Sequence, residues 1–349
     1  MNDGDFTIEV LDRVVNKQYN ELISDKKRDD IPQAFILGGQ SGAGKTGLQD
    51  IMKAQCEYNL IVINGDEFRP LHPDYAELQR KYGKDSVDFT NEFSGKGTEA
   101  LVSRLRAEKY NILVEGTLRT AEVPLATCKG FKDNGYNVTL ALVAVKPQIS
   151  YLSTILRYEK QLAAGKLPRA TAKDKHDYIV DQIPSNLREI YSSKQFDNIV
   201  IYSREGVCLY DMSKNPATTP DKIMEEVFTG KWSQKELEQF IAIGNVTQQL
   251  MEQRNAAELP DFKSNVFNKD IISAIARKNG LSYGADYIRI VSEDELTKLQ
   301  KAAADKKSDL KFSVSRKDGK IAVRYQAELK DKVNEILRSK PKSMKLKEG

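Results

Sequence analysis

Histidine and cysteine are scarce in this 349-residue chain, which has 2 histidines and 3 cysteines. The histidines, His72 and His176, lie far apart, and neither has a second histidine at the spacing of a metal pair, which argues against a zinc hydrolase. The cysteines are odd in number and widely separated, which argues against a disulfide framework or a thiolate metal cluster. A reducing compartment is therefore expected.

Long apolar runs are also missing. No segment approaches the roughly 20 apolar residues that a membrane span needs. The N-terminus lacks the basic stretch and apolar core of a secretory signal. The sequence therefore predicts a cytoplasmic protein without a membrane partner.

Length and charge indicate how the chain is organised. A chain of 349 residues exceeds one core of ordinary size, so about two domains are expected. Residues 291–349 carry an excess of Lys and Arg over Asp and Glu. Nucleic acid or an acidic partner could bind there, but a solvated helical surface accounts for the excess more simply.

The strongest single pattern is a phosphate-binding loop that follows an apolar run at 34–37. It has a glycine, four further residues and then glycine, lysine and threonine: Gly39, Gln40, Ser41, Gly42, Ala43, Gly44, Lys45 and Thr46. The glycines let consecutive N–H groups point at phosphate oxygens. Lys45 is placed to reach the β- and γ-phosphates, and the Thr46 hydroxyl to ligate Mg²⁺. The loop predicts binding of ATP or GTP.

Strand and helix patterns alternate around this loop. Apolar runs predict strands, at 34–37, 60–64, 111–115, 138–145 and 198–202. Helical spacing appears between them, at 5–28, 44–56, 97–109, 122–134, 148–163, 172–191 and 219–228. This alternation predicts an α/β domain over residues 1–230, with a parallel sheet flanked by helices.

The alternation of strand and helix patterns ends after residue 230. Helices are expected at 232–251, 269–278 and 326–338, with a linker at 255–261 and a hairpin whose Asp-Gly turn lies within 316–320. A lysine-rich tail, expected to be disordered, follows. Residues 231–349 therefore read as a smaller, mostly helical α+β extension of unknown role.

Two acidic residues end predicted strands on the side of the phosphate loop. In open parallel sheets, ligands gather beyond the carboxyl ends of the strands. Asp66 could there accept a proton from an attacking hydroxyl or hold Mg²⁺ through water, or it could simply cap the next turn. Glu115 could order the water shell of the metal.

Several other polar residues are ambiguous on pattern alone. Arg119, in the loop with Thr117, could grip a phosphate, or could be an incidental surface arginine. Glu99 opens the predicted helix from residue 97 and reads as a capping residue. Arg157 and Arg169 lie in a basic region and read as surface residues, although phosphoryl transfer does need cations.

The ordered set of motifs resembles the zeta-toxin family, the toxin kinases of bacterial toxin–antitoxin systems. The similarity runs from about residue 20 to residue 215. The matching segments are 35–46, 61–68, 72–73, 98–100, 114–120, 157–159, 169–171, 176–177, 184–187 and 204–207.

The resemblance implies a kinase that transfers the γ-phosphate of ATP to the 3′-hydroxyl of the N-acetylglucosamine unit of UDP-N-acetylglucosamine, which blocks peptidoglycan synthesis. It also implies a small antitoxin as partner. On this resemblance Asp66 is the general base, and Lys45 and Thr46 are the ATP and Mg²⁺ ligands. It further implies that the sugar nucleotide is bound by Glu99, Thr117 and Arg119. The transferring phosphoryl group would be held by Arg157 and Arg169.

The chain departs from the family at two points. The base motif of the family commonly has two carboxylates, whereas Asn64-Gly65-Asp66 has one, and Ser41 stands where proline is frequent.

Two alternative functions stay open. The acceptor could be another nucleotide, a dinucleotide cofactor or a nucleic-acid end, or the chain could be an ATP-responsive binding protein with vestigial catalysis.

Overall fold

The computed structural model describes residues 3–166, 168–214, 217–281, 283, 286–305, 308, 310, 312–317, 319–326 and 329–338. Contacts divide the chain into two compact units. The first comprises Met1–Lys231 and Glu238–Val266, and the second Trp232–Leu237 and Phe267–Gly349. Contacts therefore group residues 238–266 with the first unit. The assignment of residues 1–230 to a kinase domain and of residues 231–349 to an extension stays a prediction.

A six-stranded sheet forms the centre of the first unit, in the order β2-β3-β1-β4-β5-β6. Five strands are parallel and the edge strand β6 is antiparallel to β5. The strands are β1 (Gln33–Gly38), β2 (Ile61–Asn64), β3 (Ile112–Glu115), β4 (Asn137–Ala144), β5 (Asn198–Ser203) and β6 (Cys208–Asp211). All five strands predicted for this sheet are confirmed, and within this sheet the short edge strand β6 was not predicted.

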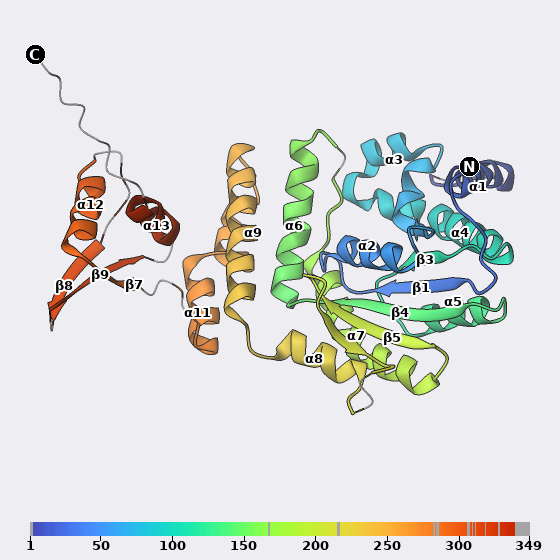
Figure 1. Ribbon diagram of the computed structural model, residues 1–349. Coiled ribbons are helices and arrows are strands. Elements are labelled where there is room, and N and C mark those ends of the chain that lie inside the picture. The colour runs from blue at the N-terminus through green and yellow to red at the C-terminus, as the bar shows by residue number, and fades with distance from the viewer. Residues whose placement is uncertain are drawn as a thin grey trace, which may run out of the picture. The chain divides into compact units, whose positions relative to one another are not determined.

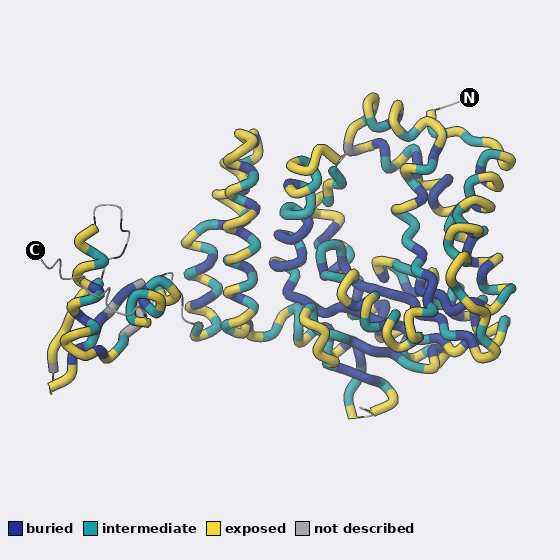
Figure 2. The backbone as a smooth tube through the Cα atoms, turned by 45° about the horizontal axis from the view of Figure 1, so that its top comes forward, coloured by how far each residue is buried: buried dark blue, intermediate teal, exposed yellow. Residues whose placement is uncertain are grey.

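Helices lie on both faces of this sheet, with α2 on one face and α5 on the other (Figure 1). The helices of this unit are α1 (Ile8–Ile23), α2 (Lys45–Gln55), α3 (Tyr75–Tyr82), α4 (Ser86–Ala107), α5 (Glu122–Lys132), α6 (Pro147–Ala163), α7 (Lys173–Ser193) and α8 (Pro220–Thr229). Helix α9 (Gln234–Gln253) follows, and its residues from 238 onward group with this unit. A short turn, α10 (Leu259–Asp261), lies within the predicted linker at 255–261, and the π-helical η4 (Phe262–Val266) follows it. The central strands β1 and β4 are buried along most of their length (Figure 2). The predicted α/β class is confirmed.

Helix α4 begins at Ser86, well before the predicted start at residue 97. The segment reads poorly as a helix because Gly95 and Gly97 fall in its middle. Gly97 is needed for packing, since a Cβ there would lie 2.6 Å from Cδ1 of the buried Phe68 ring. The prediction that Glu99 caps a helix is therefore wrong, because Glu99 lies in the interior of α4.

Strand register brings the polar strand ends together. Glu115, the last residue of β3, pairs with Leu37 of β1 on one side and with Asn64 of β2 on the other. The phosphate-binding loop follows β1 directly, and Asp66 follows β2. One edge of the sheet therefore carries the loop and both carboxylates.

The second unit is a three-stranded antiparallel sheet with helices. Its strand order is β7-β9-β8, and the elements are α11 (Lys269–Asn279), β7 (Asp286–Val291), α12 (Glu293–Ala303), β8 (Phe312–Lys317), β9 (Lys320–Gln326) and α13 (Lys330–Arg338). Leu299, Val323 and Val333 are fully buried in its core. The predicted hairpin is confirmed, whereas the lysine-rich tail lies outside the described residues. Across the described part of the chain, no helix is long and apolar enough to cross a membrane.

Candidate active site

The phosphate-binding loop connects β1 to α2. Helix α2 begins after Gly44, which is left-handed with φ 98° and gives the helix no side-chain cap. An uncapped helix N-terminus presents N–H donors and a positive dipole end to an anion. Lys45 folds back across the loop, and its Nζ donates to the carbonyls of Gly39 at 2.9 Å and Gln40 at 3.3 Å. Burial lowers the pKa of Lys45 to about 8, opposed by the negative charge of Glu115.

The back of the loop rests on the start of α6. Gly42 has φ +77°, and a Cβ there would overlap the Ser150 carbonyl oxygen. Gln40 is fully buried, and its Nε2 donates to the Val145 carbonyl at 3.2 Å and to Ser150 Oγ at 3.3 Å. These contacts fix the loop in one conformation.

His176 extends this buried network toward α7. Its Nε2 lies 2.9 Å from Ser150 Oγ, and its Nδ1 lies 3.0 Å from Oδ1 of Asp177. Burial lowers the pKa of His176, so the ring is neutral at pH 7. Ser150 and His176 are both fully buried, which keeps substrate away from the hydroxyl. The network supports the loop and does not form a nucleophile.

Asn64 organises the carboxylate edge. Its Oδ1 accepts from the Asp66 N–H at 3.0 Å, and its Nδ2 donates to Oε2 of Glu115 at 3.0 Å. Gln49 of α2 donates to the other Glu115 oxygen. Asn64, not Asp66, therefore caps the short 3₁₀ turn η1 (Gly65–Glu67), and the cap alternative for Asp66 is wrong.

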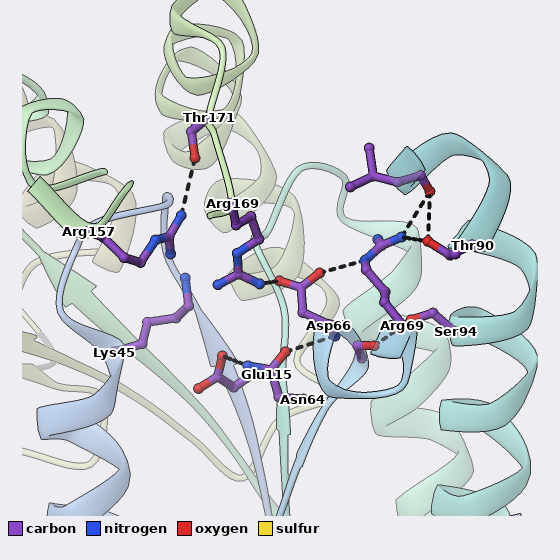
Figure 3. A network of polar contacts seen from close by, with 12 residues as sticks. Lys45, Asn64, Asp66, Arg69, Thr90, Ser94, Glu115, Arg157, Arg169 and Thr171 are labelled. Carbon is purple, nitrogen blue, oxygen red and sulfur yellow. Dashed lines mark hydrogen bonds and ion pairs between the residues drawn. The ribbon is translucent and has the colours of Figure 1, made fainter. Parts of the chain in front are cut away.

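The Asp66 carboxylate meets two guanidinium groups (Figure 3). Arg69 Nε donates to Oδ1 at 3.0 Å, and Arg169 donates to Oδ2. Asp66 is half-exposed, as a group that accepts a proton from a bound substrate must be. Arg69 was not predicted, and the only sequence signal is its position three residues after Asp66.

Arg157 adds a partly buried cation close to Lys45 and Arg169 (Figure 3). One of its terminal nitrogens donates to Thr171 Oγ1 at 3.3 Å. Its Nε is buried without a hydrogen-bond partner among the described residues. Burial, with the like charge of Arg169, lowers the pKa of Arg157 to about 10. An unpartnered buried donor among three cations fits a site that receives a highly charged anion.

Arg204 was part of a matching segment without an assigned role. It packs over Gly44, where an added Cβ would lie 3.1 Å from its Cγ, and it donates to Ser153 Oγ at 2.7 Å. Burial lowers its pKa as well. A further cation therefore flanks the phosphate-binding loop.

Two oxygen-bearing side chains predicted to be metal ligands, Thr46 and Glu115, lie at this edge of the sheet. Thr46 is exposed in the first turn of α2, and Glu115 is held by neutral amides rather than by a cation. No cluster of three or more His, Cys, Asp or Glu residues suited to a metal occurs in the described ranges.

The predicted sugar-nucleotide residues lie at the surface. Thr117 and Arg119 are exposed on the loop between β3 and α5, and Glu99 is exposed on α4. Leu118 fixes that loop, because it is buried and its carbonyl accepts from Asn186 Nδ2 at 2.9 Å. No hydrogen bond or ion pair between described residues joins these three side chains to the Asp66 cluster. The structure therefore assembles the loop, carboxylates and arginines, and leaves the acceptor residues a prediction.

Fold and site together define the chain as an α/β protein with a phosphate-binding loop and a kinase-like core. Comparison with known proteins identifies its relatives. The zeta toxin family matches residues 19–215, and the chain belongs to this family.

Three relatives each match two thirds or more of the chain. Toxin PezT of Streptococcus pneumoniae serotype 4 is 43% identical over 239 residues, which is 68% of this chain and 94% of that protein. Toxin zeta of Streptococcus pyogenes is 36% identical over 264 residues, or 75% of this chain and 91% of that protein. A solved structure from the PezAT chromosomal toxin–antitoxin system of Streptococcus pneumoniae has a TM-score of 0.67 and 40% identity, covering 72% of this chain and all of that one.

Proposed function

We propose that the protein is an ATP-dependent toxin kinase that phosphorylates the 3′-hydroxyl of the N-acetylglucosamine unit of UDP-N-acetylglucosamine. The observation that carries the proposal is a half-exposed carboxylate, Asp66, next to a phosphate-binding loop and three cationic side chains. Family membership supports the toxin role. A depleted sugar nucleotide would block peptidoglycan synthesis.

The transfer needs one proton acceptor and a cationic environment. Asp66 takes the proton of the acceptor hydroxyl. The hydroxyl oxygen then bonds to the γ-phosphorus of ATP, the bond between that phosphorus and the oxygen that bridges to the β-phosphate breaks, and ADP leaves. Arg157 and Arg169 stabilise the charge on the transferring group, and Lys45 the β- and γ-phosphates. Thr46 and Glu115 would hold Mg²⁺, which neutralises phosphate charge when bound.

The acceptor and the partner extend the proposal. Thr117 and Arg119 would bind the sugar nucleotide, with Glu99 on α4 as a further contact. A small antitoxin protein in the cytoplasm would hold the kinase inactive, which is supported by the similarity to a structure from a toxin–antitoxin system.

Mass spectrometry of products tests the acceptor. Purified protein with Mg-ATP is offered UDP-N-acetylglucosamine, other nucleotides, a dinucleotide cofactor and a DNA end in separate reactions. One added phosphate on UDP-N-acetylglucosamine, absent with Asp66→Asn, supports the proposal. Phosphorylation of another acceptor alone would replace the substrate, and no transfer with retained ATP binding would favour a binding protein.

A further inference from the structure

The two arginines that contact Asp66 differ in what else holds them. Both guanidinium groups bond the same carboxylate, Arg69 on Oδ1 and Arg169 on Oδ2. The Arg69 side chain is 19% exposed, whereas that of Arg169 is 37% exposed. The same chemical group is therefore present twice, once in a fixed setting and once in an open one.

Arg69 is anchored on the side away from Asp66. Its terminal nitrogen donates to the Val87 carbonyl at 3.0 Å and to Thr90 Oγ1 at 3.2 Å (Figure 3). Thr90 is fully buried in α4. Arg69 itself begins the 3₁₀ turn η2 (Arg69–Leu71), where Pro70 restricts the backbone. Three hydrogen bonds from two of its nitrogens therefore hold this guanidinium in place.

Arg169 is held at its backbone and at one point of its side chain. It lies on the connection between α6 and α7, and its N–H donates to Oε1 of Gln161 at 2.9 Å. Asp66 is the only hydrogen-bond partner of its guanidinium in the described chain. A long arginine side chain with one hydrogen-bond partner can exchange that carboxylate for a more highly charged phosphate group.

We propose that Arg69 is the positioning residue of the general base, whereas Arg169 leaves Asp66 for the transferring phosphoryl group when nucleotide binds. Arg69 keeps Oδ1 in place, so that Oδ2 faces the acceptor hydroxyl once Arg169 has moved. The inference rests on the proposed role of Asp66 as base. It gives two similar ion pairs on one carboxylate different functions.

A double-mutant cycle separates these functions. Arg69→Gln should lower kcat about ten- to a hundredfold with unchanged KM for ATP, because one hydrogen bond to a charged group is lost. In an Asp66→Asn background the same substitution should change the rate less than about twofold, since it acts only through the base. Arg169→Gln should lower the rate in both backgrounds and raise the KM for ATP. Thr90→Val, which removes one anchor of Arg69, should show a weaker version of the Arg69 pattern.

Arg80→Gln provides the matched surface control, because Arg80 is exposed on α3 and lies outside the site. Equal rate losses for Arg69→Gln in both backgrounds would overturn the inference while leaving the kinase proposal intact. Absence of any transfer by the unmodified protein would instead overturn the kinase proposal.

An acceptor-independent measurement then decides the inference. Arginine side-chain N–H resonances, assigned with the same substitutions, are followed by NMR as Mg-ATP is added. The Arg69 resonance should stay in place and that of Arg169 should shift. Equal shifts of both, or a shift of Arg69 alone, would contradict the division of roles.

Discussion

Raising the pH from 7 to 9 should weaken ATP binding by about tenfold because Lys45 loses its proton. Burial lowers the pKa of Lys45 to about 8, from an ordinary value of 10.5. Phosphate oxygens favour the charged ammonium, so ATP raises this pKa in the complex. Above pH 8 the unliganded protein holds a neutral amine, and binding then requires uptake of one proton. Affinity falls up to tenfold per pH unit in this window, or about 1.4 kcal/mol.

Titration with a fluorescent ATP analogue between pH 7 and pH 9 measures this effect. EDTA is included so that metal binding at Glu115 does not contribute. The other partly buried cation near Lys45 is not expected to interfere, since the pKa of Arg157 is lowered only to about 10. Lys45→Met should bind weakly and lack the change in slope near pH 8.

Glu115→Gln gives a second control. The Glu115 charge raises the pKa of Lys45, so its removal should move the break in affinity to lower pH. An affinity of the unmodified protein that is constant from pH 7 to pH 9 would refute the assignment of Lys45 as a phosphate-binding residue with a lowered pKa.

Three further predictions concern the support of the site. Arg254→Ala should destabilise the first unit by about 3–5 kcal/mol in urea unfolding, because Glu159 is buried and bonded by Arg254 at 2.7 and 2.8 Å; a loss below about 1 kcal/mol would contradict this. Gly42→Ala should abolish ATP binding, seen by calorimetry with the fold intact by circular dichroism, because the added Cβ would overlap the Ser150 carbonyl; normal affinity would show that the loop relaxes. His176→Gln should reduce the loss of stability on acidification below pH 6.5, since the folded protein keeps His176 neutral while the unfolded chain protonates; equal acid sensitivity of both proteins would exclude this role.

The sequence was most informative where a local pattern carries the structure. The phosphate-binding loop, the buried strands and the placement of Asp66 and Glu115 at one sheet edge follow from apolar runs and from the rules of parallel sheets. Helix α4 was placed too late because Gly95 and Gly97 weaken its pattern, and Gly97 is there to admit the Phe68 ring. That contact is tertiary and leaves no periodic signal.

Side-chain partnerships within the site could not be predicted from spacing. Arg69 reaches α4 at Val87 and Thr90, and Gln40 reaches Ser150, across sequence separations of 18 or more residues. Strand β6 was missed because four residues after a glycine turn read as a loop. Strand β7 and helix α12 were also not predicted. No role was predicted for the second unit, because no chemical motif was recognised in the sequence of residues 231–349.

Single-turnover transfer with Asp66→Asn tests the central claim most directly. The unmodified protein and the variant are mixed with radiolabelled ATP, Mg²⁺ and UDP-N-acetylglucosamine, and labelled sugar nucleotide is counted over time. Rapid labelling is expected for the unmodified protein, and for the variant a rate that is lower by about 10²-fold or more, with equal ATP affinity. Equal rates for the two proteins would contradict the role of Asp66, and an unlabelled sugar nucleotide in both would contradict the proposed acceptor.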